Sequence, residues 1–231
     1  MSLPRRKILR LSGKDAEEFW ENERNPPKMT EEQIAFFKDA KRLSKEHPLW
    51  GGMVINDNFV INNVRVAHLT NEYELEYFCC GNNDMDNFLK NCALTEQKDK
   101  LSMTYLVFLD SEVIGFFSLA ASSIEVLAVD MPDCAEQFAE SVYPAIDILK
   151  LAIIIKFQGK GVGEYTLKYA IGIVMSISEH IGCRYVTLDS VKDKVGFYKK
   201  YGFKIVDIYK DDEYTKMYLN IALIEAASRI N

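Results

Sequence analysis

A glycine-rich turn between a long apolar run and a long amphipathic run is the feature that most constrains this chain. The apolar run is Ile146 to Ile155, and the turn that follows reads Gln158-Gly159-Lys160-Gly161-Val162-Gly163. The apolar run predicts a central strand that is covered on both faces of a sheet. Glycines let a turn approach a ligand closely, and a following helix N-terminus presents amide N–H groups with partial positive charge. The pattern therefore predicts a strand, a phosphate-binding turn and a helix.

The helix predicted after this turn covers Val162 to Ile181. Its inward positions are Leu167, Ile171, Val174, Met175 and Ile181. Gly182 follows as the expected helix stop. A glycine-rich turn alone is weak evidence for a ligand, because strand-to-helix connections often need glycine for steric reasons. Further motifs elsewhere in the sequence are needed to predict whether the turn binds a phosphate.

The composition is that of an ordinary globular protein. The chain has 231 residues, 48% of them hydrophobic and 27% charged, which is enough to bury a sizeable core. No run approaches the roughly 18 apolar residues that a membrane helix needs, and no signal-peptide core follows the N-terminus. We therefore expect a cytoplasmic protein that does not associate with membranes. The net charge of −6 argues mildly against a positive potential over the whole surface that would attract nucleic acid. It is compatible with a local basic face that binds nucleic acid.

The cysteines and histidines indicate neither a disulfide framework nor a metal site. There are five cysteines, with no C-x-x-C pair among them, and three histidines. The cysteines are Cys79, Cys80, Cys92, Cys134 and Cys183. An odd number without metal-ligand spacing predicts reduced thiols and no bound metal.

Residues 1–52 differ from the rest of the chain and predict a helical N-terminal extension to a main domain at 53–231. The extension is polar, charged and interrupted by two prolines. Two pairs resemble helix-start capping boxes, namely Ser12 with Asp15 and Thr30 with Gln33. They predict helices near 13–24 and 31–46. The thin apolar stripe of this segment cannot form a core alone, so it must pack on the main domain or on a partner.

Hydrophobic periodicity in the main domain predicts alternating strands and helices. In chain order these are a strand beginning at Phe59 and running to Leu69, a capped helix from 82 to about 96, a hairpin of 103–109 with 113–118, an acidic segment at 129–142, the central strand, the long helix, a strand at 185–188, a short helix at 193–201, and a closing hairpin of 203–208 with 214–220. The sequence contains no internal repeat.

Two motifs and this order of elements resemble the GNAT superfamily of acetyl-CoA-dependent N-acetyltransferases, from Phe78 to about Ile221. The turn Gln158 to Gly163 fits the superfamily's pyrophosphate pattern, Arg/Gln-x-x-Gly-x-Gly/Ala. The segment Phe197-Tyr198-Lys199-Lys200-Tyr201-Gly202-Phe203 fits its F-Y-x-x-x-G-F signature. Two motifs in the right order, roughly 35 residues apart, are more specific than either alone. The resemblance implies a mixed α/β (α+β) GNAT fold, with a mostly antiparallel twisted sheet of about six to seven strands flanked by helices.

A closer resemblance is to GNAT toxins of type II toxin-antitoxin systems, which acetylate the amino group of aminoacyl-tRNA. The segments that carry it are Cys80 to Leu89, Gly115 to Ala121, Ile148 to Ala152, and His180-Ile181-Gly182. The chain departs from these toxins at Lys150, where they tend to have Arg, and at Ile153-Ile154, where they usually have Val-Asp.

The resemblance implies how acetyl-CoA binds. Backbone amides of the turn from Gly159 to Glu164 would hold the pyrophosphate. The pantetheine arm would lie along the central strand as an added strand, against backbone groups of residues 151–153, one of which would polarise the thioester. The implied binding residues are Leu151, Ala152, Ile153, Gln158, Gly159, Lys160, Gly161, Val162, Gly163 and Glu164.

The resemblance also implies a catalytic residue, Tyr198, as the general acid that reprotonates the CoA sulfur. The alternative is that Tyr198 is one more core aromatic beside Phe197, Tyr201 and Phe203. No general base is visible. His180 is expected on the surface, Glu164 complements the helix dipole, and a covalent route through Cys183 or Cys79 competes with the commoner case of inert structural thiols.

Lysines around the signature helix and the central strand predict a basic rim that meets RNA or CoA phosphates, or else a solvated face. They are Lys150, Lys156, Lys160, Lys168, Lys192, Lys194, Lys199, Lys200 and Lys204. The leading hypothesis is an aminoacyl-tRNA N-acetyltransferase of the toxin type, with charged tRNA and an antitoxin protein as partners and a homodimeric assembly. The alternatives are a GNAT enzyme for a small-molecule or protein amine, and an acyl-CoA-binding regulatory module.

Overall fold

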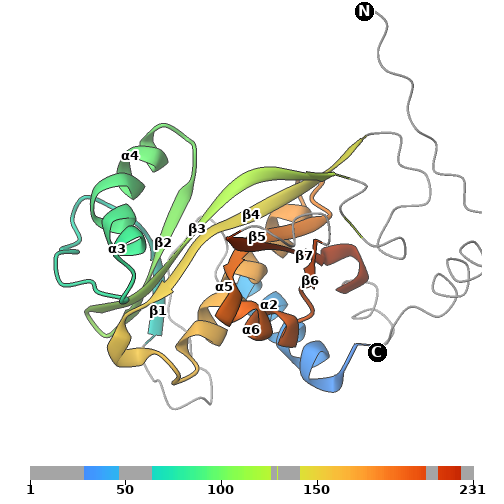
Figure 1. The fold of residues 1–231 in the computed structure, drawn as a ribbon, viewed down its shortest axis with the longest axis horizontal. Coiled ribbons are helices and arrows are strands. Elements are labelled where there is room, and N and C mark those ends of the chain that lie inside the picture. The colour runs from blue at the N-terminus through green and yellow to red at the C-terminus, as the bar shows by residue number, and fades with distance from the viewer. Residues whose placement is uncertain (1–28, 47–63, 126–128, 130–140, 207–212, 225–231) are drawn as a thin grey trace, which may run out of the picture.

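The protein folds around one seven-stranded sheet with helices on both faces (Figure 1). A computed structural model describes residues 29–46, 64–125, 129, 141–206 and 213–224. The strand order is β1-β2-β3-β4-β5-β7-β6. Every neighbouring pair is antiparallel except β4 with β5, which is parallel. The predicted fold class, a mostly antiparallel sheet flanked by helices, is confirmed.

The elements follow the predicted order. The strands are β1 (Val64–His68), β2 (Met103–Leu109), β3 (Glu112–Glu125), β4 (Val142–Ile153), β5 (Tyr185–Val191), β6 (Lys204–Ile205) and β7 (Tyr214–Asn220). The α-helices are α2 (Glu31–Glu46), α3 (Asn83–Asn87), α4 (Ala93–Lys98), α5 (Val162–Ser178) and α6 (Val195–Lys200). A π-helical turn at Phe88–Cys92 joins α3 to α4, and short 3₁₀ turns lie at Ile155–Phe157 and Lys192–Lys194. In these parts of the chain no helix is long and apolar enough to cross a membrane.

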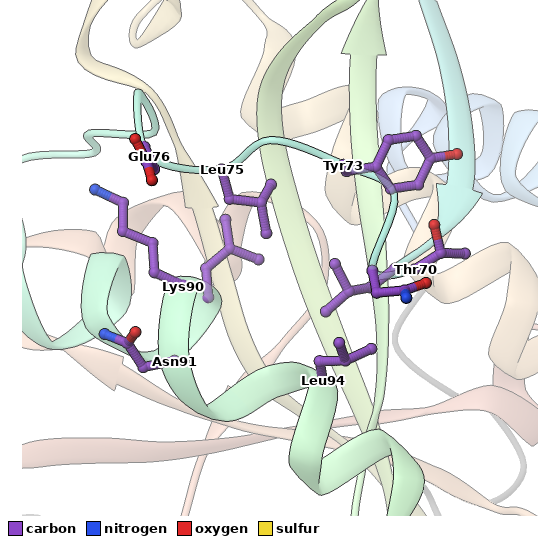
Figure 2. A pocket seen from close by; sticks show the side chains of 10 residues that line it. Thr70, Tyr73, Leu75, Glu76, Lys90, Asn91 and Leu94 are labelled. Atoms are coloured by element: carbon purple, nitrogen blue, oxygen red, sulfur yellow. The ribbon is translucent and has the colours of Figure 1, made fainter.

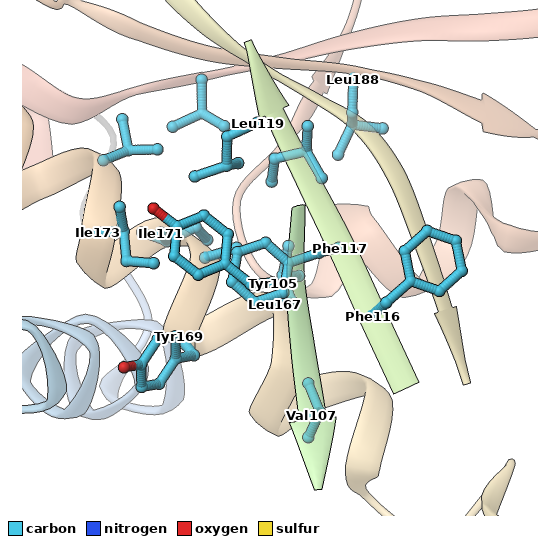
Figure 3. Close-up of a cluster of buried hydrophobic side chains, with 14 of the residues drawn as sticks. Tyr105, Val107, Phe116, Phe117, Leu119, Leu167, Tyr169, Ile171, Ile173 and Leu188 are labelled. Atoms are coloured by element: carbon cyan, nitrogen blue, oxygen red, sulfur yellow. The ribbon is translucent and has the colours of Figure 1, made fainter. Parts of the chain in front are cut away.

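The main core lies between the sheet and α5, the helix that connects the parallel strands β4 and β5. Leu167 and Ile171 on α5 are fully buried against β2 and β3 (Figure 3). The rings of Tyr105 and Phe117 stack with centroids 4.9 Å apart and an interplanar angle of 6°. Tyr169 of α5 lies beside this pair, 6.2 Å from Phe117. The apolar stripe of α5 therefore covers the middle of the sheet, as its periodicity predicts.

The opposite face of the sheet is covered by α3, the π-helical turn and α4 (Figure 1). Asn82 caps α3, because its side-chain oxygen accepts hydrogen bonds from the backbone N–H groups of Asp84 and Met85, at 2.9 and 3.2 Å. Phe88 then packs against Phe116 of β3, with ring centroids 6.1 Å apart. The turn and cap at 81–84 are predicted correctly, but the π-helical turn is not, because hydrophobic spacing does not distinguish it from an α-helix.

Helix α2 is part of the main fold and packs on α5 and α6. Its predicted capping box forms, since the Gln33 N–H donates to Thr30 Oγ1 at 3.2 Å and the Thr30 N–H donates to Gln33 Oε1 at 3.0 Å. Phe36 is 3% exposed and stacks on Tyr201, with ring centroids 4.4 Å apart. Lys168 of α5 pairs with an aspartate of α2 at 3.1 Å. The second helix of the extension thus completes the hydrophobic core.

The predicted end of the long helix is wrong. α5 ends at Ser178, and Ile181, expected to face inward, is 65% exposed. The Ser178 hydroxyl donates to the Met175 carbonyl at 2.7 Å, and such a side-chain bond competes with the helix's own backbone pattern. Gly182 is not among the glycines with positive φ, so it does not close the helix in the left-handed conformation expected of it.

Other boundaries shift by a few residues, and some predictions lie outside the described residues. β4 begins at Val142 rather than Ile146 and ends at Ile153 rather than Ile155. The predictions that fall on undescribed residues are the helix at 13–24, the start of the first strand at 59–63, most of the acidic segment at 129–142, and the turn of the closing hairpin with its adjoining strand end at 207–212. The domain boundary at 52 stays a prediction.

We expect Phe36→Ala to destabilise the whole domain. The substitution removes a buried ring that contacts Tyr201, so the free energy of unfolding should fall by about 3 kcal/mol. Urea unfolding followed by circular dichroism measures this. Lys38→Ala, at an exposed position of the same helix, is the matched control and should change little. Equal stability of the two variants would mean that α2 does not contribute to the core.

Candidate active site

The sheet opens between its two parallel strands. β4 pairs with β5 only from Ala145–Tyr185 to Ile148–Leu188, although β4 continues to Ile153 along β3. The register between β3 and β4 shifts at this point, and Leu149 is the extra residue on β4. Such a bulge bends a strand and increases its twist. β4 therefore turns away from β5 after Ile148, which leaves a gap along the edge of its last residues.

Backbone groups of β4 face this gap. The Ile154 N–H donates to the Ile114 carbonyl of β3 at 3.0 Å. Because neighbouring residues of a strand direct their polar groups to opposite edges, the groups of Ile153 and Leu151 face away from β3. The Ile153 carbonyl does so, since it accepts a hydrogen bond from a side chain beyond the strand at 2.9 Å. By the same alternation, the polar groups of Ala152 face β3.

The glycine-rich turn lies at the end of the gap and begins α5. Gly159 and Gly161 have φ of +71° and +85°, in the left-handed region that favours glycine. No atom lies within 4 Å of the position that a Gly159 Cβ would occupy, so the space beside the turn is open. Val162 is buried and fixes the start of the helix, while Lys160 is exposed. The arrangement is an open backbone cradle at the N-terminus of a 17-residue helix.

Gln158 fixes the turn rather than extending toward the open side. Its Nε2 donates to the Cys80 carbonyl at 2.8 Å and to the Ile153 carbonyl at 2.9 Å. Next to it, the Ile155 N–H donates to the Cys79 carbonyl at 3.1 Å. The segment before α3 is thereby joined to the end of β4. We interpret Gln158 as a clamp between these segments, a role that the sequence motif alone does not reveal.

Tyr198 lies on α6, which packs against the first turn of α5. A Cβ placed on Gly163 would be 3.9 Å from both Phe197 and Ile153, so α6 borders the cradle and the end of β4. Burial raises the pKa of Tyr198 to about 12. Its hydroxyl has no hydrogen-bond partner among the residues that the structure describes. A hydroxyl with this pKa keeps its proton at neutral pH, which is the protonated form that a general acid needs.

Helix α2 fixes the position of α6 from the outside. Glu32 pairs with Lys200 at 2.7 Å, and Gln33 Nε2 donates to the Lys200 carbonyl at 3.4 Å. The Tyr201 hydroxyl interacts with Glu164 and with Lys200, and burial followed by the Glu164 contact raises its pKa to about 12. Glu164, a predicted binding residue, is therefore linked through Tyr201 to the C-terminal end of α6.

Four of the nine lysines of the predicted basic rim pair with acidic groups. These ion pairs are Lys156 with Glu112, Lys168 with Asp39, Lys194 with Asp193, and Lys200 with Glu32. Lys150 and Lys160 each lie over an aromatic ring, 5.7 Å from the ring centroids of Phe88 and Phe157. Lys150 lies on the part of β4 beyond its pairing with β5, and Lys160 lies in the glycine-rich turn.

Neither Cys80, Cys183 nor a surface pocket adds a second reaction centre among the residues that the structure describes. Burial raises the pKa of Cys80 and of Cys183 to about 11, so neither is activated as a thiolate. A pocket of about 390 Å³ lies between the segment after β1 and the π-helical turn (Figure 2). It is lined by Leu69, Thr70, Asn71, Tyr73, Leu75, Glu76, Leu89, Lys90, Asn91 and Leu94, none of which is a predicted binding or catalytic residue.

These features fit acetyl-CoA. The cradle offers amide groups of residues 159–163 to a pyrophosphate, and the edge of β4 offers the Leu151 and Ile153 N–H groups to an extended amide chain. Tyr198 borders the same region. The fold and the site together define a GNAT-type acetyltransferase.

Comparison with known proteins gives the family. No family model matches the sequence. The tRNA-acetylating toxin of Mycobacterium tuberculosis (strain ATCC 25618 / H37Rv) is 30% identical over 129 residues, which are 55% of this chain and 76% of that toxin. The chain belongs to the family of tRNA-acetylating toxins, which are acetyl-CoA-dependent N-acetyltransferases of the GNAT superfamily.

Solved structures of similar fold include the toxin AtaT. AtaT complexed with acetyl-methionyl-tRNAfMet has a TM-score of 0.64 at 22% identity, covering 71% of this chain and 98% of that one. A mutant AtaT bound to acetyl-CoA and the C-terminus of the antitoxin AtaR has a TM-score of 0.58 at 20% identity, with the same coverage. At these identities the likeness shows the fold.

We expect Gly159→Ala to weaken acetyl-CoA binding. The methyl group would occupy the open side of the cradle and would strain a residue at φ +71°. A tenfold or greater rise in the dissociation constant, which corresponds to about 1.4 kcal/mol, should be measurable by calorimetry. Gly182→Ala is the control, because it has open space and no positive φ. Unchanged affinity in Gly159→Ala would place the pyrophosphate elsewhere.

Proposed function

We propose that this protein transfers the acetyl group of acetyl-CoA to the amino group of an aminoacyl-tRNA. The observation that carries the proposal is the 30% identity to a tRNA-acetylating toxin across 76% of that toxin's length. It is supported by AtaT, a protein of the same fold that has been seen with acetyl-methionyl-tRNAfMet. The gap, the cradle and Tyr198 provide the parts that such a transfer needs.

Different residues of the chain bind acetyl-CoA, polarise its carbonyl group and donate the proton. Acetyl-CoA supplies an activated acetyl thioester when it is bound. The turn at 159–163 holds the pyrophosphate, and the N–H groups of Leu151 and Ile153 align the arm and polarise the carbonyl. Tyr198 provides the proton for the leaving sulfur. Lys150, over Phe88 on the face away from α5, supplies positive charge where a tRNA 3′ end would enter.

We also propose that a protein antitoxin binds this chain. AtaT, with a similar fold, binds the C-terminus of the antitoxin AtaR. Within the described residues, α2 is held in the main core by Phe36 and Phe37. This packing argues against α2 as a detachable inhibitory segment. The predicted homodimer remains a prediction.

We expect Tyr198→Phe to reduce kcat for charged tRNA by about 10²-fold or more, while the KM for acetyl-CoA changes little. The phenylalanine keeps the ring contacts with Phe197 and Phe203 but cannot supply a proton. Transfer of labelled acetyl to methionyl-tRNA and to total charged tRNA measures this. Tyr77→Phe, at a tyrosine that is 88% exposed, is the matched control.

Transfer to charged tRNA should also weaken steeply as salt concentration rises, because phosphate contacts release counterions. Polyamines and a lysine peptide serve as competing acceptors in the same assay. Activity on these amines alone would reject the tRNA substrate, and full activity of Tyr198→Phe would reject Tyr198 as the acid.

A further inference from the structure

A half-buried carboxylate, Asp147, lies at the point where the sheet opens. It is one residue before Ile148, the last residue of β4 that pairs with β5. Phe117 of β3 contacts Tyr169 of α5, and Leu119, two residues further along β3, is the register partner of Ile148. Ile148 is therefore on the α5 side, and by alternation the Asp147 side chain is on the opposite face. That is the face covered by α3 and the π-helical turn. The GNAT motifs used above do not include this position.

The surroundings of Asp147 combine a hydrogen bond with charges of both signs. Thr187, directly opposite on β5 and fully buried, donates from Oγ1 to Asp147 Oδ1 at 2.6 Å. The charged groups that act on Asp147 are Asp189 of β5, Lys216 of β7 and Lys150 of β4. Asp189 and Lys216 are cross-strand partners. The threonine thus fixes one carboxylate oxygen at the mouth of the gap.

Asp147 and Tyr198 approach the gap from opposite faces of the sheet. Tyr198 belongs to α6, which packs beside the α5 N-terminus through Phe197 and Gly163. Lys150, three positions after Asp147 and beyond the bulge at Leu149, lies over Phe88 of the π-helical turn. An acceptor that enters along this turn would therefore meet Asp147 on one side of the gap, with the proton donor for sulfur on the other.

We propose that Asp147 is the general base, accepting a proton from the amino group of the acceptor, with Thr187 as the residue that positions it. This inference rests on the proposed acetyltransferase function and supplies the base that the sequence motifs do not identify. Asp147 is suited to the role because it lies next to the last paired residue of β4, is held in one orientation by Thr187, and is on the face opposite α5.

The proposed reaction needs only the acceptor amine, acetyl-CoA and the two proton-transfer groups. The neutral amine nitrogen forms a bond to the acetyl carbonyl carbon, and one of its protons passes to the Asp147 carboxylate. The carbon–sulfur bond breaks, and the sulfur takes the proton of the Tyr198 hydroxyl. The products are an amide and a thiol. Asp147 then gives its proton to solvent and Tyr198 regains one, so no oxidant or further reactant is needed.

The environment of Asp147 also favours proton uptake. Burial raises its pKa, the Thr187 hydrogen bond lowers it, Asp189 raises it, and Lys216 and Lys150 lower it. A carboxylate with a raised pKa is a stronger base than one in water. Because the folded protein disfavours the ionised form, the charge of Asp147 opposes stability above the pKa of the unfolded chain.

Asp147→Asn separates a catalytic role from a structural one. The amide oxygen can still accept from Thr187, so the variant should fold and should melt at the same temperature or higher. We expect kcat to fall about 10²-fold with the affinity for acetyl-CoA unchanged. Asp99→Asn, at the exposed end of α4, is the matched control. Unchanged kcat, or an effect confined to the KM of the acceptor, would overturn the proposal.

The pH dependence of kcat provides a second test, because two substitutions near Asp147 should shift its acidic limb in opposite directions. The acidic limb of the kcat profile should move to lower pH in Asp189→Asn, because a group that raises the Asp147 pKa is lost. It should move to higher pH in Thr187→Val, because a stabilising hydrogen bond is lost. A limb that does not move in Asp189→Asn would overturn the assignment.

The same assay distinguishes this inference from the proposed substrate. If wild-type protein acetylates a polyamine or a peptide but not charged tRNA, the proposed substrate fails, and Asp147→Asn is then measured on the amine that reacts. If wild-type protein acetylates charged tRNA and Asp147→Asn is as active, only the base assignment fails. If wild-type protein acetylates no amine, both fail.

Discussion

The short parallel pairing of β4 with β5 is the constraint on which the site depends. Two adjacent parallel strands require a crossover, and α5 provides it, so its N-terminus is placed at the end of β4. The bulge at Leu149 then separates the strands beyond Ile148. One local irregularity therefore produces both a free strand edge and a helix N-terminus beside it. The candidate ligand site is thus a consequence of where the sheet stops pairing.

Much of this fold is predictable from the sequence because its elements have strong local signals. The 103–109 strand, the cap at Asn82 and the box at Thr30 and Gln33 all form as predicted, since each depends on side chains near it in the chain. The apolar run that ends at Ile155 predicts a central strand, and β4 is the fourth of the seven strands in the sheet. The resemblance to GNAT enzymes is supported by the fold and by family membership.

What the sequence did not predict depends on contacts between distant segments. Periodicity predicts a later end for α5 than Ser178, because it contains no information about the hydrogen bond from the Ser178 hydroxyl to the Met175 carbonyl. The position of Asp147 at the gap depends on the bulge and on Thr187 of the next parallel strand, and neither has a local signature. The packing of α2 on Tyr201 likewise depends on tertiary structure, because Phe36 and Tyr201 are far apart in the sequence. Motif matching identified the cradle, but not the residues that fix its walls.

The double hydrogen bond of Gln158 gives a chemical reason for the first position of the pyrophosphate motif. One terminal nitrogen must serve two carbonyl oxygens, those of Cys80 and Ile153, which come from segments on either side of the site. A planar group with several N–H donors meets this demand, and among long side chains only glutamine and arginine carry one. A glutamate has no N–H to donate, and its carboxylate oxygens would repel the two carbonyl oxygens. In this chain the first position of the motif therefore holds two backbone segments together, and its side-chain chemistry follows from that task.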